Sequence, residues 1–448
     1  MPSFSRSKAV FLLSGAVLFF LIGFGFRAGR IPPNDALEQA WKQAKSLISE
    51  PHFLNDQAYD REGAQTVGSG VQHSGLTLLV SVWKTAGSWE PGIKLINQRG
   101  DTIHAWRIHP EELFPTLQEK GRIGYIHGTQ LLPDGDLVFN IEPRMGTARV
   151  DACGTVQWTI AGGSHHSVGQ ASDGSFWISD ISSHPRTKSK EFPNGYPGLD
   201  HPVYVDKIAH VSSSGDIIEK INLLDVIYEN DLEKHISKAY ISADASVPTG
   251  TLPTEDITHL NDVEPLSENM ADEYPQFETG DLLISLRNLH LVFVLDPDTQ
   301  TVKWHSSKPF TMQHDPDFMG DGWIGVFDNR RDFTETGNML GGSRIVAVQP
   351  QSDSLKSLFP TSLSDTFYTA VGGKWQRLDN GNLLLNEYTE GRVVEVAPDG
   401  RTVWEWIKSP TDTGQVPSVQ EATRYDLTKE TTSSWPCASE ETVRSPSS

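Results

Sequence analysis

Cysteine is scarce in this chain, whose 448 residues include only two, Cys153 and Cys437. Two cysteines in unlike sequence contexts argue against a disulfide framework and against a cysteine metal site, although they leave one long-range disulfide open. Positive charge is scarce as well, because 37 Lys and Arg residues face 58 Asp and Glu residues, for a net charge of −21. Scattered negative charge repels phosphate backbones, so we expect no nucleic-acid partner.

One apolar run is long enough to matter. Residues 9–26 contain no charged side chain, and basic residues flank them on both sides. The run has about the minimum length for a membrane span, and no small-residue cleavage site follows it, so we expect an uncleaved signal anchor. Residues 1–31 would then form a cytoplasmic stub and transmembrane anchor, and residues 32–69 a helical stalk. The larger C-terminal body is expected on the extracytoplasmic, periplasmic side.

The remaining sequence is too long for one ordinary core unless its architecture repeats. From about residue 70 to 407, six copies recur of a polar Asp-Gly-like turn, an apolar strand, a loop and a second apolar strand. Each copy supplies about four short strands, which suits one blade of a β-propeller. The sequence therefore predicts an all-β, six-bladed β-propeller at 70–407 and a polar, partly disordered tail at 408–448.

Three copies share a histidine seven residues before the aspartate of the turn, namely His127, His166 and His314. His259 holds the same place in a fourth copy, where an insertion delays the turn. Because the first strand of each blade lies nearest the propeller axis, we expect the four side chains to face one small volume. The alternative is that histidine belongs to the repeat and that each ring bonds its own turn. Gly373, at the equivalent place in the last copy, argues against that alternative.

Two polar residues indicate the kind of ligand. Asn261 follows His259 by two residues, so both lie on one side of an extended chain, and Arg287 comes just after the strand of the same copy. A guanidinium keeps its proton and offers a fork of donors that suits a tetrahedral oxyanion, whereas it would repel a divalent ion. The set predicts an anion site, with a surface salt bridge of Arg287 as the alternative. His165 and His290 are interpreted as incidental.

These motifs resemble the bacterial arylsulfotransferases that do not use PAPS, which are six-bladed propellers with an axial histidine site. MQHDPDFMGDGWIGVFDNR is similar to the stretch with that family's nucleophilic histidine and falls on His314. HLND is similar to the family's His-x-Asn pair at His259 and Asn261, and SLRN places its arginine at Arg287. HHSVGQASDG resembles the segment with a further active-site histidine, His166. The membrane span, and the lack of a closely spaced disulfide, depart from the family.

The resemblance implies a sulfotransferase that uses no nucleotide, metal or other cofactor, and the chain indeed has no P-loop sequence. His314 would attack the sulfur of an aryl sulfate, and the sulfohistidine would pass the group to a phenol. The histidine, asparagine and arginine of HLND and SLRN would hold the sulfuryl oxygens. His166 would move the proton; His127, a weaker candidate for that step, is otherwise expected to line the substrate site. The expected partners are aryl sulfates, phenols and the membrane, with a homo-oligomer left open.

Two other functions fit parts of the pattern. Four axial histidines on a propeller also resemble the iron-dependent carotenoid oxygenases, since imidazoles suit iron, copper or zinc. A metal centre would require all four histidines to point at one ion with Arg287 turned away. A non-catalytic, membrane-tethered binding propeller is the other alternative, because a fold alone does not fix function. It predicts histidines more than about 10 Å apart, or buried against their own turns.

Overall fold

The structure is a computed structural model that describes residues 53–68, 70–85, 88–115, 124–199, 201–239, 256–332, 334 and 336–437. The expected membrane anchor at 9–26, most of the expected stalk and the last residues of the tail lie outside this described part. No helix among the described residues is long and apolar enough to cross a membrane.

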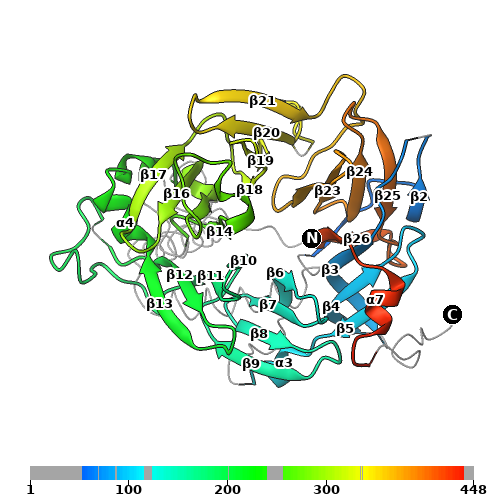
Figure 1. The fold of residues 1–448 in the computed structure, drawn as a ribbon, viewed down its shortest axis with the longest axis horizontal. Coiled ribbons are helices and arrows are strands. Elements are labelled where there is room, and N and C mark those ends of the chain that lie inside the picture. The colour runs from blue at the N-terminus through cyan, green and yellow to red at the C-terminus, as the bar shows by residue number, and fades with distance from the viewer. Residues whose placement is uncertain are drawn as a thin grey trace, which may run out of the picture. The chain divides into compact units, whose positions relative to one another are not determined.

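In the unit that begins at Asn55, six antiparallel sheets stand around a common centre, with the innermost strand of each sheet beside that centre (Figure 1). We number these sheets as blades 1 to 6 in chain order. From the centre outward, blade 2 consists of β6 (Tyr125–Leu131), β7 (Leu137–Glu142), β8 (Gly146–Val150) and β9 (Val156–Ala161). Blade 3 consists of β10 (Val168–Gln170), β11 (Phe176–Ile181), β12 (Asp206–Val211) and β13 (Ile217–Asn222).

The next two blades repeat this order. Blade 4 consists of β14 (Leu260–Pro265), β15 (Leu282–Leu286), β16 (Leu291–Asp296) and β17 (Thr301–Ser306). Blade 5 consists of β18 (His314–Phe318), β19 (Ile324–Asp328), β20 (Arg344–Gln349) and β21 (Ser354–Phe359). The all-β, six-bladed propeller predicted from the repeats is confirmed.

Blades 1 and 6 each use a strand from outside the predicted 70–407 range. Blade 6 consists of β22 (Trp375–Arg377), β23 (Leu383–Glu387), β24 (Arg392–Val396), β25 (Thr402–Ile407) and the added outer strand β2 (Gly63–Thr66). Blade 1 consists of β27 (Val419–Tyr425), β3 (Leu76–Thr85), β4 (Ser88–Ile96) and β5 (Thr102–Arg107). Two further short strands, β1 (Leu54–Asp56) and β26 (Gln415–Pro417), lie outside the blades.

The strand β27 corrects the expectation of a polar, partly disordered tail at 408–448. Its residues VQEATRY look polar, but five of the seven are buried because β27 is the innermost strand of blade 1. Past β27, Trp435 is 6% exposed and packs in the core between blades 1 and 2. The disulfide that the sequence left open is present and joins Cys153 of blade 2 to Cys437.

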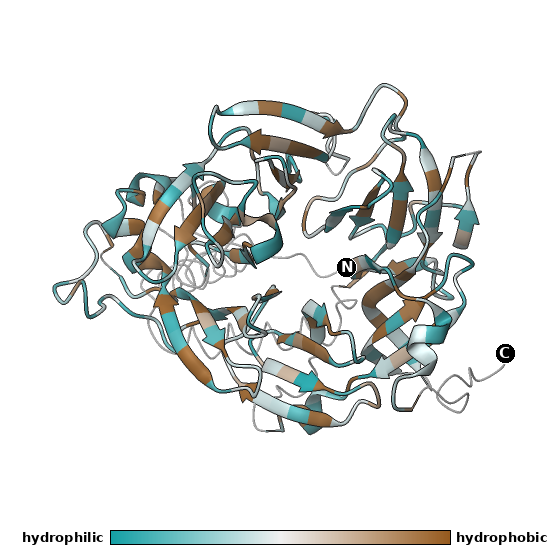
Figure 2. Ribbon diagram, viewed as in Figure 1, coloured by the Kyte–Doolittle hydropathy of each residue, from teal (hydrophilic) through white to brown (hydrophobic). Residues whose placement is uncertain are grey.

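The blades hold together face to face. Middle strands such as β7 and β15 are buried along their whole length, since both faces pack on neighbouring blades, whereas the outer strand β13 is mostly exposed. Figure 2 accordingly shows hydrophobic residues concentrated on the strands and hydrophilic ones on the loops. Among the described residues, five short helical segments lie between strands, and a sixth follows the last strand: α3 (Pro110–Leu113), α4 (Leu223–Glu229), η1 (Glu233–Lys238), α6 (Glu268–Ala271), η2 (Arg287–Leu289) and, after β27, α7 (Lys429–Ser433).

Candidate functional site

The structure brings the four predicted histidines together on blades 2 to 5. His127 lies in β6, His166 and His259 come just before β10 and β14, and His314 is the first residue of β18. The ring centroids of His127 and His166 are 4.4 Å apart, and those of His166 and His259 are 4.7 Å apart. His314 lines the same pocket as His127 and His166. Both centroid distances are well below the separation of about 10 Å that a non-catalytic propeller predicts.

The four histidines are nevertheless not equivalent in backbone conformation. His166 and His259 themselves adopt left-handed φ angles of 48° and 52°. In blades 2 and 5 the left-handed residue is the one after the histidine, Gly128 at 85° and Asp315 at 45°. A left-handed φ is costly for any residue other than glycine, and such residues concentrate at functional sites. His127 and His314 therefore form one pair and His166 and His259 another.

A buried amide fixes the hydrogen on His314. Asn329 is fully buried, and its Nδ2 donates to the carbonyl oxygens of Thr369 at 3.0 Å and Gly372 at 2.7 Å. This orientation leaves Asn329 Oδ1 facing His314 Nδ1 at 2.6 Å. Because an amide oxygen can only accept, Nδ1 must carry the hydrogen, and Nε2 then presents its lone pair.

Asp256 lies next to both His259 and Arg287. His259 Nδ1 lies 2.6 Å from Asp256 Oδ2, and Arg287 Nη2 lies 3.8 Å from the same oxygen. The backbone N–H of Arg287 also donates to the carbonyl of His259 at 3.0 Å, so β14 and η2 hold both side chains together. His259 Nε2 is buried and has no hydrogen-bond partner among the described residues. It is a polar atom that a ligand can satisfy.

Asn261 is also held in place, and the hydrogen bond that holds it uses one of its own N–H groups. Its Nδ2 donates to the carbonyl of Gln313 at 2.7 Å, and its Oδ1 is buried without a hydrogen-bond partner in the described part of the chain. One N–H remains for an anionic oxygen, while the free Oδ1 can only accept. Asn261 can therefore contact a ligand through either atom.

Charge in this region is set by burial and by Arg287. Burial lowers the pKa of the Arg287 guanidinium to about 10, which leaves it charged at neutral pH. Burial and the neighbouring Arg287 charge hold the pKa of His314 well below its ordinary value. The same two causes lower the pKa of His259, and burial together with nearby histidines lowers that of His166 far more. At neutral pH these three rings are therefore neutral.

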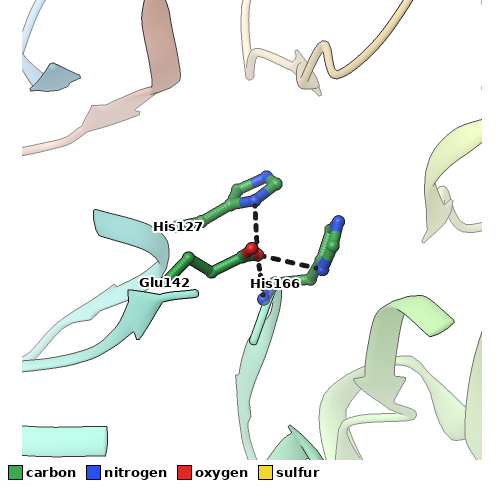
Figure 3. A group of neighbouring side chains, drawn as sticks. All are labelled: His127, Glu142 and His166. Atoms are coloured by element: carbon green, nitrogen blue, oxygen red, sulfur yellow. Dashed lines mark hydrogen bonds and ion pairs between the residues drawn. The ribbon is translucent and has the colours of Figure 1, made fainter. Parts of the chain in front are cut away.

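A carboxylate that the sequence analysis missed lies between two of the histidines (Figure 3). Glu142 Oε1 is 3.2 Å from His127 Nδ1 and 3.1 Å from His166 Nδ1. Tyr125 donates its hydroxyl to Glu142 Oε2 at 3.0 Å, and the N–H of His166 donates to Oε1 at 3.2 Å. Burial alone would raise the pKa of Glu142, but the hydrogen bond and charge of His127 outweigh it and lower the pKa to about 2.

His165 also belongs to this network, which corrects its interpretation as incidental. Its Nδ1 lies 2.9 Å from His166 Nδ1, and its Nε2 lies 3.4 Å from Asp206 Oδ1. The Asp206 carboxylate, working against burial, raises the pKa of His165. His166 therefore lies between two partners, Glu142 and His165.

The pocket continues past the histidines into an acidic stretch of the channel. Asp262, Asp315 and Glu421 line it together with one cation, Lys374, whose Nζ lies 2.5 Å from Asp315 Oδ1. The full lining is His127, Gly128, Thr129, His166, Ser167, Val168, Asn261, Asp262, His314, Asp315, Gly373, Lys374, Gln420 and Glu421. His259 and Arg287 are not part of this lining.

Only one set of three potential metal ligands exists among the described residues: His127, Glu142 and His166, whose ligand atoms lie within 4.8 Å of one another. His259 and His314 are not part of it, because their ring nitrogens do not lie within that separation of all its members. The described residues therefore do not gather all four histidines into one ligand set. The separations within the set are also those of ordinary hydrogen bonds.

Comparisons with known proteins give one family. The family model described as arylsulfotransferase (ASST) matches residues 128–409, more than half of the chain. No curated protein sequence matches the chain.

Solved structures that are similar belong to proteins of varied description. A protein of unknown function from Bacteroides caccae is 13% identical, with a TM-score of 0.47 over 78% of this chain and 98% of that chain. Virginiamycin B lyase from Staphylococcus aureus is 12% identical, with a TM-score of 0.34 over 64% of this chain and 71% of that chain. Hydrazine synthase from Kuenenia stuttgartiensis is 11% identical, with a TM-score of 0.37 over 69% of this chain and 71% of that chain.

Proposed function

The chain belongs to the arylsulfotransferase family, and we propose that it transfers a sulfuryl group from an aryl sulfate to a phenol through a covalent intermediate on His314. The observation that carries this proposal is the hydrogen bond between His314 Nδ1 and the fixed amide oxygen of Asn329. It leaves Nε2 as a neutral base with an available lone pair, which is what a nucleophile needs.

The sulfuryl oxygens are held by the groups around Asp256. Arg287 stays charged and offers planar donors, and His259 offers its unpartnered Nε2. The bound anion would favour the protonated form of His259, whose Nδ1 hydrogen already faces Asp256. Asn261 adds its remaining N–H. These donors stabilise the charge that spreads over the sulfuryl oxygens in the transition state.

We further propose that residues 9–26 anchor the chain in a membrane and that the propeller lies on the extracytoplasmic side. The disulfide between Cys153 and Cys437 supports this placement, because such bonds persist in oxidising compartments. Recovery of the protein from membranes only with detergent, together with protease access to the propeller from the extracytoplasmic side, tests it.

The central experiment incubates the full-length protein with a chromogenic aryl sulfate, with and without a phenol acceptor, beside a His314→Ala variant. We expect phenol release that the acceptor stimulates, and a loss of at least about a thousandfold in the variant, because the proposed covalent step needs Nε2 of His314. A sulfated His314 peptide should appear by mass spectrometry when donor is supplied alone. Turnover that survives His314→Ala would remove the residue from this role.

A further inference from the structure

We propose that His127, held in place by Glu142, is the acid and base that protonates the leaving phenolate and then deprotonates the acceptor phenol. This inference rests on the proposed sulfuryl transfer through His314. It gives the proton-transfer role to the histidine that the sequence made the weaker candidate for that step, and a positioning role to Glu142.

The first argument is the direction of the displacement. In transfer of such a group the attacking and leaving atoms lie roughly in line on opposite sides of the central atom. His314 attacks from blade 5, so the leaving oxygen must face the opposite side of the channel. In a ring of six blades the opposite side is blade 2, as Figure 1 shows. The histidine of blade 2 is His127, which lines the same pocket as His314.

The charges in the channel agree with this placement. Burial, Arg287, His259 and His127 lower the pKa of His314, so His127 lies close enough to act on the nucleophile. His127, His259, His165 and Arg287 in turn act on His166. His166 belongs to blade 3, beside the groups that would hold the sulfuryl oxygens.

Glu142 prepares His127 for the proton transfer. Since the carboxylate is ionised and its Oε1 lies 3.2 Å from His127 Nδ1, that nitrogen donates, and the other nitrogen, Nε2, lies on the ring edge away from Glu142 (Figure 3). The Tyr125 hydroxyl holds the far oxygen of the carboxylate. With Nδ1 held in this way, Nε2 is the ring atom that can pass a proton to the leaving oxygen and take one from the acceptor.

His166 is less suited to this step although it touches the same carboxylate. Its Nδ1 is shared between Glu142 Oε1 and His165 Nδ1, at 3.1 Å and 2.9 Å. Burial, three neighbouring histidines and Arg287 disfavour its charged form. His166 is therefore the poorer carrier of a proton beside Glu142.

The proton count closes over both half-reactions. In the first, the His314 Nε2 lone pair bonds to sulfur, the bond from sulfur to the aryl oxygen breaks, and the Nε2 proton of His127 goes to that oxygen. In the second, the acceptor hydroxyl gives its proton to His127 Nε2 while its oxygen bonds to sulfur, and the N–S electron pair returns to His314. Both side chains end as they began, and no other reactant is required.

The test compares donors whose leaving phenols differ in acidity. With nitrophenyl sulfate the departing phenolate is stable, so His127→Ala should slow phenol release by less than about tenfold; with unactivated phenyl sulfate it should slow release at least about a hundredfold, the usual worth of a general acid. His166→Ala is the matched control, expected to reduce both donors by a similar factor. Equal losses for both donors in His127→Ala, or a donor-dependent loss in His166→Ala instead, would overturn the proposal.

Glu142→Gln tests the positioning role separately. Because the carboxylate orients the His127 ring through Nδ1, its loss should slow turnover of phenyl sulfate at least about tenfold and leave turnover of nitrophenyl sulfate nearly unchanged. Equal losses for the two donors in a folded Glu142→Gln protein would contradict it, as would stoichiometric transition metal in the wild type that this variant loses. If the wild type turns over neither donor, the proposed function itself fails, which is a distinct result.

Discussion

At the scale of single residues, the neutral amide of Asn329 has a consequence for the intermediate as well as for the nucleophile. An amide oxygen can orient the Nδ1 hydrogen of His314 but is too weak a base to remove it. Once Nε2 bonds to sulfur, the imidazole ring therefore keeps Nδ1–H and bears a positive charge. A cationic ring is a better leaving group than a neutral one, so the sulfohistidine would pass its sulfuryl group on readily.

We therefore expect Asn329→Asp to slow the second half-reaction. The carboxylate would preserve the orientation of His314 but share or take its Nδ1 proton, which stabilises the intermediate. Phenol release from nitrophenyl sulfate should show a burst of about one equivalent per enzyme, followed by a steady state slower by about tenfold or more. Rapid-mixing kinetics measures both phases, and mass spectrometry detects the retained sulfuryl group.

The control for this prediction is Asn329→Leu, which cannot accept a hydrogen bond. Asn329→Leu should slow the first half-reaction, in which phenol is released from nitrophenyl sulfate. Without the amide oxygen, Nδ1 and Nε2 compete for the hydrogen, and the reactive form of His314 is less populated. A normal steady-state rate without a burst in Asn329→Asp would show that the amide has no part in releasing the sulfuryl group.

The site residues that could be predicted from the sequence and those that could not lie at different places in a blade. His314 and His259 lie at the start of innermost strands, where the repeat marks a position relative to the turn. Glu142 ends a second strand, and Asn329 follows one, so their distance to a histidine depends on how two strands pair. No repeat spacing reports that pairing. An acid directly after an apolar strand was the one available signal for Glu142.

At the scale of elements, packing explains why blade 6 contributes no histidine to the group. Blade 6 carries Gly373 where blades 2 to 5 carry histidine, with a left-handed φ of 102°. A Cβ built there would lie 2.7 Å from the ring of Phe327 in β19. The aromatic core between blades 5 and 6 thus occupies the space that a sixth-blade side chain would need, so the absence of histidine there does not report on function.

Gly373→Ala should accordingly destabilise the protein more than a glycine substitution with the same backbone strain alone. Gly381 is the matched position, since its φ is 85° and the nearest atom to a built Cβ is Pro398 Cγ at 3.6 Å. Both variants pay for the left-handed backbone, and overpacking against Phe327 should cost Gly373→Ala about 1–3 kcal/mol more. Denaturant unfolding measures the difference; equal midpoints would mean that Phe327 moves aside freely.

At the scale of the whole molecule, the ring closes with segments from both ends of the described chain. β2 joins the outer edge of blade 6, and β27 becomes the innermost strand of blade 1. Counting repeats could give the number of blades because every blade shows the same alternation of turns and apolar strands. It could not give the closure, since β27 reads as polar and pairs with a strand about 340 residues earlier in sequence.

The disulfide should strengthen this closure. Cys437 follows β27 and α7 and is bonded to Cys153 of blade 2, at a sequence separation of 284, so it holds the closing segment against the next blade. A cross-link over so long a loop restricts the unfolded chain strongly. We expect the double variant Cys153→Ser/Cys437→Ser to lose about 2–4 kcal/mol of unfolding free energy. The variant should still fold and transfer sulfuryl groups at low temperature, because β27 keeps its pairing with β3 and none of the proposed catalytic residues contacts either cysteine.

Trp435→Ala separates the two contributions of the segment: it removes core packing while leaving the disulfide in place. If the double variant unfolds at the same denaturant concentration as the wild type, then β27 and Trp435 alone close the ring and the disulfide only marks the compartment.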